Sequence, residues 1–60
     1  MKVLKLVYKF HKDGRDYTII GDNRTSARLG IEISFHVDLS GAKYEETLRN
    51  GTVLASGFVR

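Results

Sequence analysis

The sequence predicts an all-β domain: a small five-stranded barrel, closed or partly open, built from two hairpins around one long bent strand. Two observations carry this expectation. Every second residue from Ala27 to Leu39 is apolar, which is typical of a strand with one buried and one solvated face. The dipeptides Asp13-Gly14 and Asn50-Gly51 are of the kind that close two-residue hairpins.

Size and composition limit the class of protein. Sixty residues predict a single domain over residues 1–60, at the small end of what folds alone. The chain has no cysteine, which excludes disulfides and agrees with a reducing, cytoplasmic location. Lysines interrupt the apolar residues that follow Met1. The sequence therefore predicts no signal peptide, no membrane span and no membrane partner.

The first element expected in chain order is a hairpin that starts with residues 2–11. One face of this segment carries its large apolar side chains: Leu4, Leu6, Tyr8 and Phe10. If Asp13-Gly14 forms the turn, the register pairs Lys12 with Arg15, His11 with Asp16, Phe10 with Tyr17, Lys9 with Thr18, Tyr8 with Ile19 and Val7 with Ile20. Aromatic residues then face each other on the inner side, and a histidine faces a carboxylate on the outer side.

The long apolar alternation raises a problem of length. Thirteen residues in a straight strand would span roughly 43 Å. A compact domain of this size is only about 27 Å across. The strand must therefore bend within the domain or extend toward a second copy. Gly30 belongs to the outward set of residues, and its missing side chain favours a bend at that point.

The segment 42–49 has two interpretations. As a strand, it enters a second hairpin through the turn Asn50-Gly51. This register pairs Leu48 with Val53, Glu46 with Ala55 and Tyr44 with Gly57. A tyrosine ring over a glycine on the neighbouring strand stabilises sheets, so we favour the hairpin. The alternative is a β-rich α+β fold with a short helix at 42–49, capped by Ser40.

The number and order of the expected hairpins suit small SH3-like barrels, such as those of archaeal chromatin proteins. No residue motif of that or another family occurs in the chain. Because the sequence has no proline to protect sheet edges, closure of the barrel or pairing between chains is expected.

Catalysis is not predicted. The one group of side chains that resembles a site is the outward set Glu32, Ser34, His36 and Asp38 of the expected long strand. Neighbours in this set would lie about 6.5–7 Å apart, so His36 and Asp38 could share a metal ion. A solvated polar face explains the set better, because a domain this small rarely encloses a substrate pocket. We predict no enzyme, no metal, no cofactor and no small-molecule substrate.

The charge pattern favours a nucleic-acid partner. The net charge is +3, and the excess of basic residues lies within residues 1–28. The predicted function is non-catalytic binding of nucleic acid through phosphate contacts of the N-terminal hairpin and the residues that follow it. The candidate contact residues are Lys5, Lys9, Lys12, Arg15, Arg24 and Arg28.

A second function class remains open. The unprotected sheet edges and the outward pair Val7 and Ile20 predict a protein-interaction module or small inhibitor, which acts by sheet-edge pairing or homodimerisation. A third possibility is a designed sequence without a selected function, which the regular alternation and the two X-Gly turns would also fit.

Overall fold

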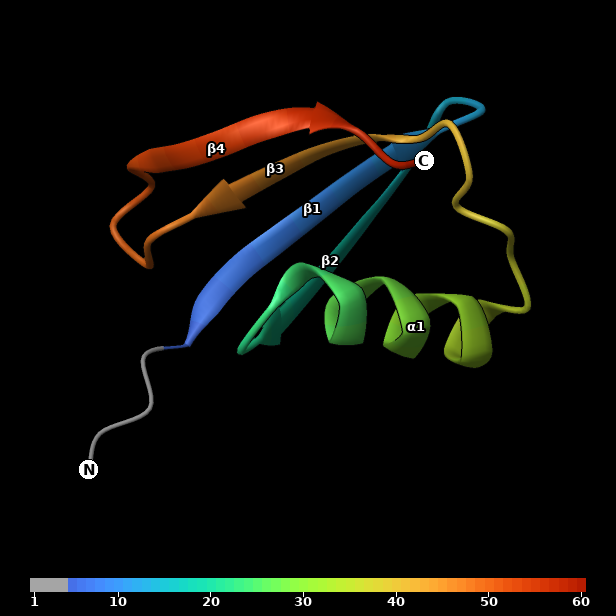
Figure 1. Cartoon of the computed structure of the whole chain (residues 1–60), viewed down its shortest axis with the longest axis horizontal. Coiled ribbons are helices and arrows are strands. Elements are labelled where there is room, and N and C mark those ends of the chain that lie inside the picture. Colours follow the sequence, from blue (N-terminus) through green and yellow to red (C-terminus); the bar gives the residue numbers. More distant parts are fainter. Residues whose placement is uncertain (1–4) are drawn as a thin grey trace.

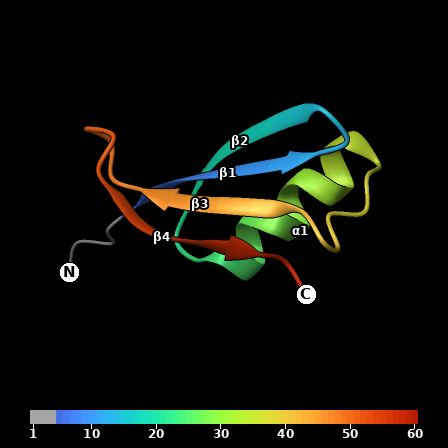
Figure 2. The same ribbon diagram turned by 90° about the horizontal axis from the view of Figure 1, so that it is seen from above.

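The computed structural model describes residues 5–60, and this part of the chain forms four strands and one helix (Figure 1). Their order is β1 (Leu6–Lys12), β2 (Arg15–Gly21), α1 (Arg24–Phe35), β3 (Lys43–Thr47) and β4 (Val53–Phe58). The strands form one antiparallel sheet in the order β2-β1-β3-β4, as Figure 2 shows from above. The two hairpins therefore meet at the centre of the sheet, where β1 pairs with β3.

The prediction of a long strand from Ala27 to Leu39 is wrong, because most of this segment forms α1. Asn23 caps the helix: its backbone is extended (φ −151°, ψ 163°), and its side chain accepts a hydrogen bond from the Ser26 N–H at 2.8 Å. The helix ends at His36, which adopts a left-handed conformation with φ 53°. The predicted bend at Gly30 is absent too, since this residue lies inside the helix.

The predicted five-stranded, SH3-like barrel is not confirmed. Within residues 5–60 the sheet has four strands, and β2 and β4 form its two edges. Five strands required residues 27–39 to cross the sheet as a strand, whereas α1 lies beside the sheet (Figure 1). The alternative of a β-rich α+β fold names the right mixture of elements but places its helix wrongly, because Lys43–Thr47 is a strand.

The first hairpin is confirmed in every predicted pair, from Lys12 opposite Arg15 to Val7 opposite Ile20. Its turn residues Asp13 and Gly14 both have positive φ, 53° and 75°, as this type of turn requires. The expected start of the strand at residues 2–4, including Leu4 on the inner face, lies outside the described residues.

The second hairpin is confirmed in two of the three predicted pairs. Tyr44 lies opposite Gly57, and Glu46 lies opposite Ala55. A bulge after Glu46 shifts the register, so Val53 pairs with Thr47 and not with Leu48. The tyrosine ring does lie on the glycine: a Cβ atom added at Gly57 would be 3.2 Å from Tyr44 Cε1.

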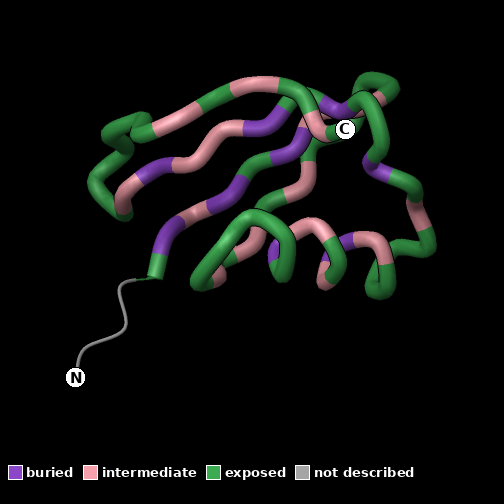
Figure 3. The backbone as a smooth tube through the Cα atoms, in the orientation of Figure 1, coloured by how far each residue is buried: buried purple, intermediate pink, exposed green. Residues whose placement is uncertain are grey.

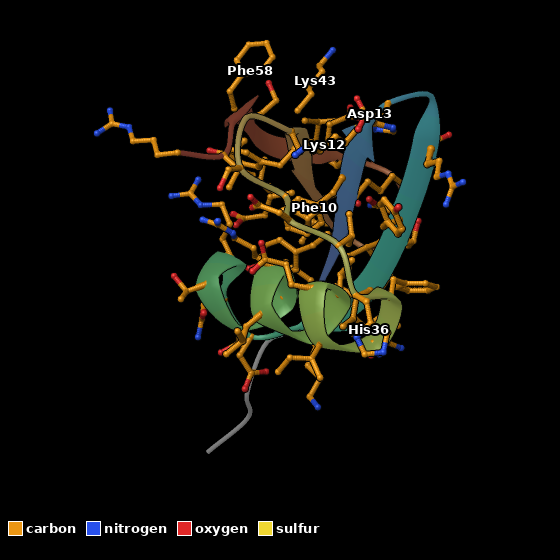
Figure 4. The ribbon with its side chains drawn as sticks, turned by 90° about the vertical axis from the view of Figure 1, so that its right-hand side faces the viewer. Phe10, Lys12, Asp13, His36, Lys43 and Phe58 are labelled. Carbon is orange, nitrogen blue, oxygen red and sulfur yellow. The ribbon has the colours of Figure 1, made fainter. Side chains whose placement is uncertain are left out.

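The core lies between α1 and one face of the sheet (Figures 3 and 4). Its buried hydrophobic side chains are Leu6, Tyr8, Phe10, Ala27, Ile31, Leu39, Ala42 and Tyr44. Gly30 lets the helix approach β2 closely, since a Cβ atom there would be 3.0 Å from Ile19 Cδ1. The opposite face of the sheet is not covered by the helix, and we call it the open face.

Candidate binding surfaces

The open face can be assigned from the register of the strands. Leu6, Tyr8 and Phe10 point toward the helix, so the alternate residues of β1 point away from it. Three rows of side chains then cross the four strands. The apolar row contains Ile20, Val7, Thr47 and Val53; the middle row contains Thr18, Lys9, Glu45 and Ser56; the third row contains Asp16, His11, Lys43 and Phe58. Figure 4 shows Lys43 and Phe58 pointing away from α1.

The apolar row brings large hydrophobic side chains to this face, and Phe58 in the third row is a further one, 72% exposed. Ile20 is 52% exposed and Val53 is 53% exposed, although both side chains are large and hydrophobic. Leu54 continues this apolar end of β4 and is 49% exposed. Between the two edges, Val7 is half-buried and Thr47 is buried, with its hydroxyl donating to the Val7 carbonyl oxygen at 3.4 Å. The two residues predicted as an interface, Val7 and Ile20, thus lie side by side on the open face.

His11 connects three strands on the same face. Its Nδ1 lies 2.5 Å from Asp16 Oδ1 on β2, and its Nε2 lies 3.1 Å from Glu45 Oε1 on β3. These hydrogen bonds, that of Asp16 before that of Glu45, raise the pKa of His11 above its usual value. With Lys9 and Lys43 beside the two carboxylates, the open face carries charges of both signs in balance. No metal-binding group of three His, Cys, Asp or Glu side chains occurs within residues 5–60.

A groove lies on the other side of the sheet, between α1 and the end of β4. It has a volume of about 460 Å³ and is lined by Arg24, Thr25, Arg28, Tyr44, Phe58, Val59 and Arg60. We call it the arginine groove. The Arg24 guanidinium lies 4.5 Å above the centre of the Tyr44 ring and donates a hydrogen bond to the Tyr44 hydroxyl.

Arg28 is held in place by several acceptors. Its Nε donates to Glu32 Oε2 at 3.2 Å, its Nη1 to the Arg60 carbonyl oxygen at 3.0 Å, and its Nη2 to Ser40 Oγ at 3.0 Å. The Glu32 carboxylate also accepts the Leu39 N–H at 2.8 Å, which fixes the chain after the helix. This network joins the helix, the connection to β3 and the end of β4.

The structure does not gather the predicted phosphate-binding residues on one surface. Lys5 precedes β1, Lys9 lies on the open face, and Arg15 lies at the exposed end of the first hairpin. The Lys12 side chain has a structural role, because its Nζ donates to the carbonyl oxygens of Asp38 and Ser40 at 2.5 and 3.0 Å. Only Arg24 and Arg28 come together, in the arginine groove.

The set of polar residues considered for catalysis is also dispersed. Glu32 lies on α1, His36 ends the helix, and Asp38 follows it. The Asp38 carboxylate accepts the Ser40 N–H at 2.9 Å, and this hydrogen bond lowers the pKa of Asp38. Their expected position on one strand face was wrong because the strand itself is absent. On the core side of the sheet, the pKa of the Tyr8 hydroxyl is raised, mainly by burial and next by the negative charge of Glu46.

Several residues of the two surfaces were missed from the sequence. The interface prediction did not include Val53 and Leu54, whose exposure follows from their place on an edge strand. Tyr44 and Arg60 were not associated with Arg24, because no local pattern relates three segments so far apart in the chain. The predicted pairing of Tyr44 with Gly57 was the one feature of the sequence that correctly positioned a residue of the arginine groove.

No helix within residues 5–60 is long and apolar enough to cross a membrane. Comparison of the chain with known proteins gives no match among protein-family models, curated proteins or solved structures.

Proposed function

We propose that the protein is a non-catalytic interaction module, cytoplasmic in location, that pairs with a second copy of itself through the open face. The observation that carries the proposal is the apolar row, which leaves Ile20 and Val53 half exposed at the two edges of the sheet. Contiguous apolar surface on a small domain usually marks a site of protein contact. Between these two side chains the row contains half-buried Val7 and buried Thr47.

The charges of the open face favour a second copy as the partner. We consider a two-fold axis that runs parallel to the strands, between β1 and β3, and places β1 of one copy over β3 of the other. Each row then faces the same row in reverse order. In the middle row, Lys9 of one copy faces Glu45 of the other, and this contact occurs twice. The middle row is therefore complementary to itself in charge.

The same axis sets the contacts of the other two rows. In the apolar row, Ile20 of one copy lies over Val53 of the other, which removes both exposed side chains from water. In the third row, Asp16 lies over Phe58 of the other copy, and His11 lies over Lys43. Asp16 and Glu45 hold the His11 ring on both sides, so this contact is compensated in charge.

The size of the face indicates a weak dimer. Four strands of five to seven residues give a face of roughly 20 Å by 20 Å, or about 400 Å² per copy in projection. Stable interfaces bury about 800 Å² on each partner, so this face belongs to the small, transient class. The dimer must therefore be observed over a range of protein concentrations.

Substitution of Ile20 by lysine is expected to abolish this association. The change places a charge in the apolar row, where the dimer would have to desolvate it. Light-scattering mass of the wild type should rise with concentration from the 6.8 kDa of one chain toward twice that value, whereas Ile20→Lys should stay at 6.8 kDa. Ile33→Lys is the matched control, because Ile33 is 66% exposed on α1, away from the open face. A wild-type mass independent of concentration, or equal masses for the two variants, would contradict the proposal.

Charge exchange between Lys9 and Glu45 tests the two-fold arrangement itself. Lys9→Glu places two glutamates opposite each other in the dimer, and Glu45→Lys places two lysines there, so each variant alone should remain monomeric. An equimolar mixture restores both contacts between unlike chains, and its mass should rise as that of the wild type does. Lys9 and Glu45 are also neighbours within one chain, but mixing cannot repair a contact inside a chain. A mixture that stays monomeric would exclude this axis.

A further inference from the structure

The arginine groove contains unused hydrogen-bond donors that are already held in position. A guanidinium group has five N–H donors. In the described residues Arg24 uses one of them, for the Tyr44 hydroxyl, while the ring below it fixes the plane of the group. Arg28 uses donors on all three of its nitrogens, and its Nη1 and Nη2 each retain one more N–H. The groove therefore presents several oriented donors to its interior.

The groove also has a positive charge that its lining does not neutralise. Its seven lining residues include three arginines and no aspartate or glutamate. Glu32 and Asp38 are the ion-pair partners of Arg28, at 3.2 and 3.8 Å. Asp22 and Glu46 line a neighbouring pocket together with Arg24 but form no ion pair with it in the described residues. Within the described residues Arg24 is a fixed guanidinium group without a paired carboxylate, and such a group is suited to anions, above all to phosphate, which accepts two parallel N–H bonds.

We propose that the arginine groove binds a phosphate group that is part of a nucleotide or nucleic acid. Arg24 supplies the main donors, Arg28 adds its free N–H groups, and the Thr25 hydroxyl is a neutral donor beside them. A volume of about 460 Å³ exceeds what an isolated phosphate fills and lies in the range of sites for small organic ligands. Arg24 and Arg28 of the site belong to α1, which lies on the side of the sheet opposite the open face, whereas Phe58 belongs to both surfaces.

The proposal places the phosphate contacts on α1, whereas the sequence predicted them mainly on the first hairpin. On the hairpin, Lys12 donates to two carbonyl oxygens, and Lys9 lies opposite Glu45. Lys12 is therefore held by backbone carbonyl oxygens, and Lys9 has a carboxylate on the neighbouring strand. Arg24, in contrast, forms no ion pair in this part of the chain.

The test uses the complete chain, a fluorescent single-stranded oligonucleotide of mixed sequence and inorganic phosphate as probes. We expect the anisotropy of the oligonucleotide to rise on binding, and the affinity to fall as salt increases. Arg24→Gln should weaken binding at least about tenfold, because two or more charge-assisted hydrogen bonds are lost. Arg15→Gln removes the same charge from the exposed hairpin and should change the affinity less than about twofold. Thermal unfolding of both variants establishes that they are folded.

The two probes distinguish the sources of the phosphate. Oligonucleotide binding that is sensitive to Arg24→Gln supports the site and assigns it to nucleic acid. Shifts of the Arg24 and Thr25 amide resonances with inorganic phosphate, without oligonucleotide binding, support the site and assign it to a small phosphorylated compound. Equal losses for Arg24→Gln and Arg15→Gln overturn the proposal, because they indicate general attraction between charges. The absence of any effect of either probe at low salt overturns it as well.

Discussion

Replacing Ile31 by alanine is expected to lower the free energy of unfolding by about 2–5 kcal/mol, while the same change at Ile33 should cost less than about 1 kcal/mol. The two residues are two positions apart on α1, but Ile31 is 1% exposed and Ile33 is 66% exposed. Alanine at Ile31 leaves a cavity between the helix and the sheet. At Ile33 it removes a solvated side chain, and the better helix propensity of alanine offsets part of the loss.

The comparison is best made by urea unfolding of both variants at one protein concentration, because self-association would add to the apparent stability. A domain of this size has a total stability on the order of 3–9 kcal/mol, so Ile31→Ala should unfold at a much lower urea concentration than the wild type. Ile33→Ala should differ little. If residues 27–39 formed a strand, Ile31 and Ile33 would lie on the same face, and the two substitutions would have similar effects.

This pair of residues explains why the helix was not predicted. The alternation from Ala27 to Leu39 was interpreted on the assumption that all its apolar side chains are buried together, which only a strand permits. The structure buries Ala27 and Ile31, four residues apart, and leaves Leu29 and Ile33 in contact with solvent. The expected strand was longer than a compact domain of this size, and this length argued against a straight strand. A helix of 12 residues spans about 18 Å and needs no bend.

The parts of the fold that were predicted correctly are those fixed by local chemistry. The turn residues Asp13 and Gly14 determine the register of the first hairpin, and the space above Gly57 determines the position of Tyr44. Pairing of β1 with β3 is not local, because it depends on α1 crossing between the hairpins. The arginine groove has the same origin: Arg24 reaches Tyr44 only after the helix packs on the sheet. No pattern within one segment carries that information.

Replacing Phe10 by alanine is expected to cost about 3–5 kcal/mol, enough to remove most or all of the stability of a domain this small. Phe10 is 0% exposed and lies between the sheet and α1 (Figure 4). Its register places it between Tyr17 on β2 and Tyr44 on β3. A cavity there would also weaken the packing of Tyr44, and with it the position of the Arg24 guanidinium. Phe10→Ala should therefore show loss of cooperative unfolding in urea, together with loss of near-ultraviolet circular dichroism.

Phe35→Ala is the matched control for this loss. Phe35 is 61% exposed and contacts the Tyr17 ring at a centroid distance of 5.2 Å, so its removal should cost only about 1 kcal/mol. Phe10→Leu separates the loss of volume from the loss of the ring: it retains an apolar side chain and should keep a cooperative transition with lower stability. If Phe10→Ala unfolds at the same urea concentration as Phe35→Ala, Phe10 does not lie in the core. The sheet would then pack on α1 through its other face, and the assignment of the open face to Val7 and Ile20 would fail with it.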